Sequence, residues 1–297
     1  MASEITELFG YSPTDTSATA RAARHSQQCP FIGSPCTKKL NDGVISGVCT
    51  IKPSRSSPVI CCPVRLYANN YKILSDIATR AFGAGVVLCP SSTARNYQPK
   101  PGEKRVAVFG KRWGSELPLP TGAGMGSYYV DWILALLDQN DALVEFVPVE
   151  VQSIDTTGNY RAERLARMNE QSFSRRSTAG LNWENVNKRI LPQLIYKGHV
   201  LRRERLCRNG LSFVCPKPVF DKIQIRLGGN LLQYVPQPGA ITFISYDLGS
   251  PVTAGNLRTL VQTGTLTTTI DQVANAFSAP VNLPPANVYE TAIRGSL

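Results

Sequence analysis

The segment from residue 128 to residue 152 contains two apolar runs that are separated by a short polar turn. Residues 128–137 and 143–151 are rich in Val, Leu, Ile, Phe and Tyr, and the sequence Asp-Gln-Asn-Asp lies at 138–141. Side chains of this kind favour β-strands, and a polar turn of this length joins neighbouring antiparallel strands. The segment therefore predicts a β-hairpin, around which the rest of the chain has to be arranged.

Two carboxylates converge near the open end of this hairpin if its register follows the turn. When Leu137 pairs with Ala142, Asp131 lies opposite Pro148. Glu150 shares the face of Pro148, because side chains alternate along a strand with a period of two. Asp131 and Glu150 are then diagonal neighbours, roughly 7–8 Å apart between backbones, and their side chains can meet.

A pair of carboxylates in this position suits Mg2+, a hard cation that takes oxygen ligands. Gln152 lies on the same face, one step beyond Glu150. Ordinary polar alternation on a half-exposed strand is the alternative. The companion residues Val144 and Phe146 are apolar, however, and carboxylates at the end of an apolar face favour a functional site.

Five cysteines occur close together in a turn-rich N-terminal segment. They are Cys29, Cys36, Cys49, Cys61 and Cys62. Four thiolates can hold zinc or iron in a closed tetrahedral site, and a small segment with little core of its own needs such a structural link. Buried free thiols are the alternative, and the spacing leaves open whether Cys61 or Cys62 is the fourth ligand.

The charge of the chain is concentrated in one block. The whole sequence has 32 Lys and Arg against 21 Asp and Glu, and residues 161–226 alone have 15 against 5. Arg161, Arg164 and Arg167 recur every third residue, which places them along one side of a helix. A solvated basic surface is the alternative. Because a block of one sign attracts polyanions and arginine matches phosphate groups, we expect double-stranded DNA as the partner.

The remaining patterns predict a mixed α/β (α+β) protein. Helices are expected at residues 71–82 and 270–277, short strands at 105–109 and 241–247, and a kink or two short helices around Pro192. No apolar run is long enough for a membrane span, and the first residues lack the pattern of a secretory signal. We therefore expect a cytoplasmic protein without a membrane partner.

Several short motifs resemble those of one nuclease family. In chain order they are Glu7-Leu8-Phe9-Gly10, Cys29-Pro30-Phe31, Cys36, Gly47-Val48-Cys49, Cys62-Pro63-Val64-Arg65, Gly114-Ser115-Glu116-Leu117, Tyr129-Val130-Asp131-Trp132 and Val149-Glu150-Val151-Gln152. This combination resembles the NotI/EagI family of Type II restriction endonucleases. The similarity extends over residues 7–226, and residues 182–197 are similar to a helical segment of that family.

The resemblance implies a PD-(D/E)xK nuclease core, a mixed sheet flanked by helices, in which Gln152 replaces the usual lysine. It implies that Asp131, Glu150 and the backbone carbonyl of Val151 bind Mg2+. Gln152 would orient the attacking water or the phosphate, and Glu116 would help to position a metal or its water.

The resemblance also implies an N-terminal iron site, with zinc as the other candidate metal. The family's last ligand precedes a proline, which matches Cys62 and makes Cys61 the extra residue. The implied ligands are Cys29, Cys36, Cys49 and Cys62.

These features together predict a four-cysteine metal-binding subdomain at residues 1–68 and an endonuclease domain at 69–297. We expect a bacterial homodimer that cuts double-stranded DNA at a short GC-rich palindrome, with 5′-phosphate and 3′-hydroxyl ends, and that is paired with a cognate DNA methyltransferase. The rival is a non-catalytic DNA-binding regulator with a structural metal site. It shares the basic block and the cysteines, but it does not need converging carboxylates.

Overall fold

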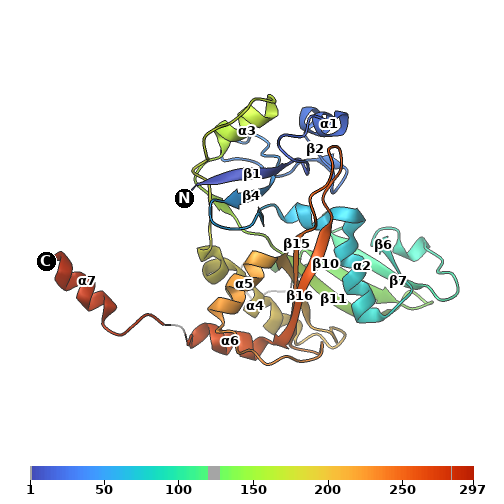
Figure 1. Ribbon diagram of the computed structural model, residues 1–297. Coiled ribbons are helices and arrows are strands. Elements are labelled where there is room, and N and C mark those ends of the chain that lie inside the picture. The colour runs from blue at the N-terminus through green and yellow to red at the C-terminus, as the bar shows by residue number, and fades with distance from the viewer. Residues whose placement is uncertain (1, 120–127, 282) are drawn as a thin grey trace.

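A seven-stranded mixed sheet forms the centre of the protein in a computed structural model that describes residues 2–119, 128–281 and 283–297 (Figure 1). The strand order is β16-β15-β14-β11-β10-β7-β6. The pairs β6–β7, β11–β14 and β14–β15 are parallel, and the other pairs are antiparallel. The strands are β6 (Val86–Pro90), β7 (Lys104–Gly110), β10 (Trp132–Leu137), β11 (Leu143–Val151), β14 (Leu211–Pro216), β15 (Ala240–Leu248) and β16 (Leu260–Thr269).

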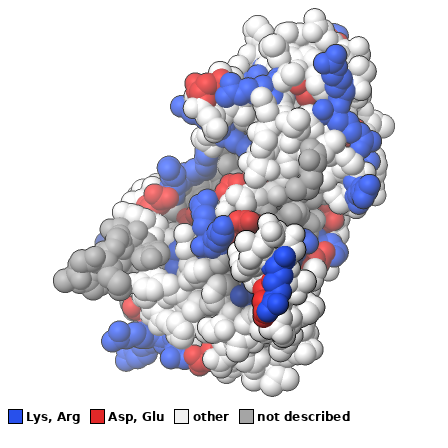
Figure 2. Space-filling view, turned by 90° about the vertical axis from the view of Figure 1, so that its left-hand side faces the viewer, with Lys and Arg blue, Asp and Glu red and all other residues white. Residues whose placement is uncertain are grey.

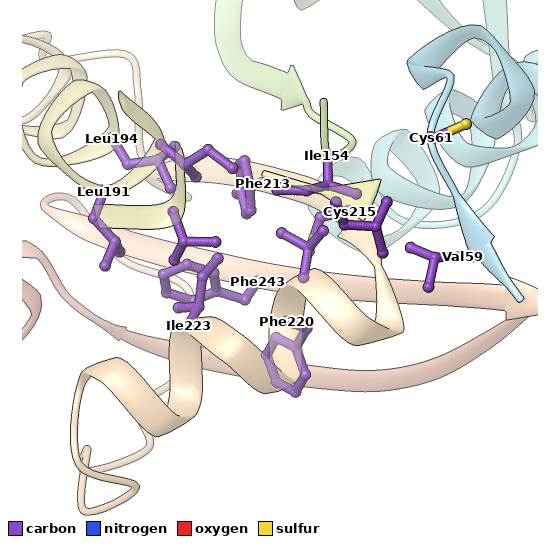
Figure 3. Packing of buried hydrophobic residues seen from close by; sticks show 14 of the residues in the cluster. Val59, Cys61, Ile154, Leu191, Leu194, Phe213, Cys215, Phe220, Ile223 and Phe243 are labelled. Atoms are coloured by element: carbon purple, nitrogen blue, oxygen red, sulfur yellow. The ribbon is translucent and has the colours of Figure 1, made fainter. Parts of the chain in front are cut away.

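Helices cover both faces of this sheet, which confirms the mixed α/β class. Helix α2 (Ala68–Phe82) packs on one face, where Leu74 and Ile77 belong to the same buried cluster as Val108. Helices α4 (Leu191–Leu201) and α5 (Lys217–Arg226) cover the other face. Figure 3 shows Leu194 of α4 and Ile223 of α5 near the rings of Phe213 and Phe243, which belong to β14 and β15.

The hairpin of β10 and β11 forms as expected, but its predicted register is wrong by two residues. Ile133, rather than Asp131, lies opposite Pro148, and Trp132 lies opposite Val149. One residue of this difference arises at the turn, because Leu137 pairs with Leu143 rather than with Ala142. The other arises at a β-bulge between Leu136 and Leu137, since Leu136 pairs with Glu145. A shift of two residues keeps every side chain on its face, so the predicted faces are retained.

The N-terminal segment forms a small sheet of its own. Its strands are β1 (Ser3–Leu8), β4 (Val48–Pro53) and β5 (Val59–Ile60), in the order β1-β4-β5. Helix α3 (Arg161–Met168) contacts this small sheet, and the backbone amide of Ile5 on β1 donates to Glu163 Oε1 on α3 at 2.8 Å. Later parts of the chain thus complete the N-terminal sheet, and the division at residue 68 stays a prediction.

The arginines of α3 do not form the exposed row that their spacing indicates. Arg164 is buried, and its Nε donates to the backbone oxygen of Ser46 at 2.7 Å. Arg161 forms an ion pair with Asp42. Both arginines therefore contact the N-terminal segment, Arg164 from a buried position and Arg161 from an exposed one.

Other helix predictions agree with the structure. A π-helical turn η3 (Val186–Ile190) directly precedes α4, whose first turn contains Pro192. Helix α6 (Ile270–Ser278) follows β16, and α7 (Val288–Ser296) lies away from the body of the molecule (Figure 1). The remaining elements are α1 (Ala18–Ser26), η1 (Pro63–Tyr67), η2 (Ala94–Asn96), β2 (Gln28–Cys29), β3 (Ser34–Pro35), β8 (Pro118–Leu119), β9 (Tyr128–Tyr129), β12 (Thr156–Thr157) and β13 (Gly180–Leu181). Among the described residues, no helix has the length and apolarity that a membrane crossing requires.

Candidate active site and cysteine cluster

The structure brings Asp131 and Glu150 together at one end of the β10–β11 hairpin. Asp131 immediately precedes β10, and Glu150 is the penultimate residue of β11. The observed register places them across from each other, since Trp132 pairs with Val149. The backbone amide of Val151 donates to Asp131 Oδ2 at 2.8 Å, which fixes the orientation of that carboxylate.

A lysine that the sequence analysis did not single out completes this group. Lys197 Nζ on helix α4 lies 2.6 Å from Glu150 Oε1, and their side chains are only 5% and 8% exposed. The sequence contained a signal for this contact. Leu191 and Leu194 form the apolar face of α4, and Lys197 continues that face three residues later.

Each carboxylate has one oxygen that is held by the protein. Lys197 holds Glu150 Oε1 and the Val151 amide holds Asp131 Oδ2. Glu150 Oε2 is buried and has no hydrogen-bond partner among the described residues. A buried carboxylate oxygen without a partner costs free energy. A cation bound to this oxygen would remove that cost, so the oxygen is a candidate metal ligand.

Burial dominates the protonation of both acids. Burial raises the pKa of Glu150 most, the nearby charge of Asp131 adds to the increase, and Lys197 opposes it, with a net pKa of about 7. The pKa of Asp131 is raised by burial and by Glu116, while the Val151 amide and Lys197 act in the opposite direction. Two acids that disfavour each other's ionisation are typical of a functional site.

Glu116 and Gln152 lie at the margins of this group. Glu116 is exposed in the segment after β7, and it is close enough to Asp131 to influence its pKa. Gln152 is half-buried directly after β11, and its backbone amide donates to the Val214 oxygen at 2.9 Å. The amide side chain of Gln152 brings no charge to the site.

The four cysteines that the resemblance implies as ligands line one small cavity. Its wall also includes Phe9, Lys38 and Val64, and its volume of about 10 Å³ is close to the size that holds one water molecule. In the described residues, no three Cys, His, Asp or Glu side chains are arranged as a metal site. The cysteines in this wall are Cys29, Cys36, Cys49 and Cys62.

Cys61 lies outside that wall and interacts with Lys38 instead. Lys38 Nζ is 3.3 Å from Cys61 Sγ and donates to the Cys61 backbone oxygen at 2.9 Å. Burial raises the pKa of the Cys49 thiol, and burial also raises that of Cys62 to about 12.

Exposed basic residues remain elsewhere in the 161–226 block. Arg203, Arg205 and Arg208 are exposed around the turn after α4. Figure 2 shows basic side chains over much of one face of the molecule, several of them next to acidic ones. The basic residues on this face are therefore interspersed with acidic groups rather than gathered into one continuous patch.

A family model described as Restriction endonuclease NotI matches residues 14–223, which is more than two thirds of the chain. The chain belongs to the NotI restriction endonuclease family. The NotI match includes the four cysteines of the cavity and the group of Asp131, Glu150 and Lys197. No curated protein matches the chain. Membership of the NotI family confirms the resemblance seen in the sequence, and it indicates a site-specific endonuclease that acts on double-stranded DNA.

Proposed function

We propose that this NotI-family protein cleaves double-stranded DNA with Mg2+ at the site formed by Asp131 and Glu150. The observation that carries the proposal is the convergence of the half-buried Asp131 and the buried Glu150 at the end of β10 and β11. Family membership supports the cleavage of DNA. The geometry supports the choice of residues.

The side chains at this site fit a hard divalent cation. Glu150 Oε2 is buried without a partner among the described residues, and Asp131 already has one oxygen fixed by the backbone of β11. Asp131, Glu150 and the carbonyl of Val151 would hold Mg2+, because it prefers oxygen ligands. When bound, the ion supplies polarisation of the scissile phosphate and a lowered pKa of bound water.

The protein's own residues orient the reactants. Gln152 would position the water or the phosphate by hydrogen bonding, and Glu116 would help to position a metal or its water from the exposed side. Hydrolysis that breaks the bond to the 3′ oxygen leaves 3′-hydroxyl and 5′-phosphate ends. This arrangement corresponds to a PD-(D/E)xK core in which Gln152 stands at the lysine position.

The target and the assembly follow from the same proposal. A palindromic site matches a two-fold symmetric protein, so we propose a homodimer with one active site for each DNA strand. The target is a short GC-rich palindrome, and a cognate DNA methyltransferase protects the same sequence in the bacterial cytoplasm.

The cysteine cavity is proposed as a structural metal site. Cys29, Cys36, Cys49 and Cys62 supply four soft sulfur ligands, which suit iron or zinc and leave no open position for catalysis. Purified protein should contain one iron or zinc per chain, and Cys49→Ser should lose it and destabilise the N-terminal sheet. Cys61→Ser is the matched control, and elemental analysis without any iron or zinc would refute the site.

The active-site assignment is tested with Asp131→Ala and Glu150→Gln. Each should reduce cleavage by about 1,000-fold or more and leave DNA binding in EDTA within about threefold. Glu145→Gln removes a carboxylate from the same strand outside the site and serves as the control. Cleavage at the normal rate by either active-site variant would refute the assignment.

The rival function is a DNA-binding regulator that does not cut. It shares the basic residues and the cysteine cavity, but it gives no reason for the unpaired buried oxygen of Glu150. DNA that is bound and remains intact in Mg2+, over a wide range of sequences, would favour the regulator.

A further inference from the structure

The strand that carries Glu150 has no positively charged residue at the proposed cleavage site, where Gln152 is neutral. Gln152 cannot supply a positive charge, and Asp131 and Glu150 together bring two negative charges when they are ionised. Hydrolysis of a phosphodiester adds further negative charge at the phosphate in the transition state, which a fixed cation stabilises. A positive group from another part of the chain is therefore expected at this site.

Lys197 is in the position to supply that charge. Its Nζ atom is 2.6 Å from Glu150 Oε1, although it comes from helix α4 and not from β11. The backbone of α4 is held close to α6, because a Cβ atom added at Gly198 would lie 2.6 Å from Ile270 Cδ1. The ammonium group is thus fixed by packing of a helix and does not depend on a flexible loop.

Stability does not explain this ion pair. Desolvation of a buried pair offsets much of its electrostatic attraction, so apolar side chains of the same size are often as good or better. The pair is also incomplete, since Glu150 Oε2 has no partner among the described residues. Lys197 therefore holds only one of the two oxygens of Glu150.

We propose that Lys197, which reaches Glu150 from helix α4, is the fixed cation of the cleavage site. It is a positioning residue that orients Glu150, and its positive charge favours the phosphate and partly offsets the two carboxylates. The inference rests on the proposed function, because it assigns a role within the same reaction. It requires no proton transfer by Lys197.

The test compares Lys197→Met with Lys197→Arg. Lys197→Met should lower the single-turnover cleavage rate at saturating DNA and Mg2+ by about 100-fold or more, and Lys197→Arg should recover at least about tenfold of that loss. Lys188→Met is the matched control, because it removes a charge from the same basic block in an exposed pair with Glu184. Circular dichroism and thermal unfolding show whether each variant is folded.

A second measurement is independent of cleavage. Mn2+ alone is titrated into the DNA-free protein in place of Mg2+. Removal of the ammonium group should tighten Mn2+ binding by about tenfold in Lys197→Met, because a positive charge next to the carboxylates repels the ion. A purely structural Lys197 predicts the opposite sign, since Glu150 would then lose its fixed orientation.

The outcomes separate the two proposals. Cleavage by Lys197→Met within about threefold of the wild-type rate, or equal losses in Lys197→Met and Lys197→Arg with weaker Mn2+ binding in both, would overturn the role of Lys197. If the wild-type protein cuts no DNA, the proposed function fails. The sign of the change in Mn2+ affinity still decides whether Lys197 offsets the carboxylates.

Discussion

The protein contains two buried ion pairs that are built in different ways. Arg65 forms two hydrogen bonds to Glu7, at 3.0 and 3.1 Å, and a third to the backbone oxygen of Arg258 at 2.7 Å. Its guanidinium also lies over the Phe31 ring. Thr50 donates a further hydrogen bond to Glu7, so both oxygens of this carboxylate are used.

The pair of Lys197 and Glu150 has fewer contacts, although Arg65 Nη1 also lacks a partner among the described residues. It has one contact between the two residues, an unpaired carboxylate oxygen and a second acid beside it. The well-supported pair connects β1, η1 and the segment before β16, which is a structural task. The comparison teaches that a buried charge with few partners is a better candidate for function than one with many.

The largest difference between the pairs is expected in stability. Arg65→Met leaves Glu7 buried without a cation, which should lower the free energy of unfolding by about 3–5 kcal/mol. Lys197→Met should cost less, because burial already favours the protonated form of Glu150. Urea unfolding measures both, with Lys72→Met in an exposed pair as control. If Arg65→Met and Lys197→Met lowered the free energy of unfolding equally, the two pairs would not differ in their contribution to stability.

Replacement of both partners sharpens the same contrast. Glu150→Leu with Lys197→Met should leave stability unchanged or raise it by about 1–4 kcal/mol, as for other incomplete buried pairs. Glu7→Leu with Arg65→Met should destabilise the protein, because the Arg258 oxygen and Thr50 lose their partners. If the Glu7→Leu, Arg65→Met variant were more stable and the Glu150→Leu, Lys197→Met variant less stable than the wild type, the structural and functional roles of the two pairs would be reversed.

The pH dependence of stability should also come from the Glu150 pair. The pKa of Glu150 is about 7 in the folded protein and 4.5 without the fold, so the folded state binds more protons between these values. Stability in EDTA should therefore fall as the pH rises through this window, by at most about 1.4 kcal/mol per pH unit for one proton. Glu150→Gln should flatten the slope, and an unchanged slope would contradict the assignment.

The smallest expected effect separates exposed from buried basic residues. Arg205→Ala should reduce the salt dependence of nonspecific DNA binding by about one unit of slope, because one phosphate contact is lost. Arg164→Ala should leave that slope unchanged and lower stability, since the buried Arg164 donates a hydrogen bond to the backbone oxygen of Ser46. Fluorescence anisotropy over a range of salt concentrations measures the slope, and an unchanged slope in Arg205→Ala would exclude a phosphate contact there.

Local patterns predicted much of the fold. The hairpin strands and the helix that ends before Gly83 follow from residues that are close in the sequence. The register was wrong by two residues because the turn is one residue longer than expected and a bulge between Leu136 and Leu137 adds another. The faces were nevertheless retained, so Asp131 and Glu150 could be paired from the sequence.

The third member of the site could not be found in the same way. Lys197 is 47 residues from Glu150, and a count of charges places it among the solvent-facing residues of the basic block. Its position on the apolar face of α4 was the available signal. Arg164 was missed for the same reason, because only the tertiary structure decides which charges of an amphipathic helix are buried.

The most direct test is incubation of the wild-type protein with unmethylated plasmid or phage DNA, in Mg2+ and separately in EDTA. The carboxylate site predicts discrete fragments in Mg2+ and intact DNA in EDTA, with fragment ends that give the target sequence and the cut position. DNA that is retained by the protein on a gel but stays intact in Mg2+ would contradict cleavage at Asp131 and Glu150.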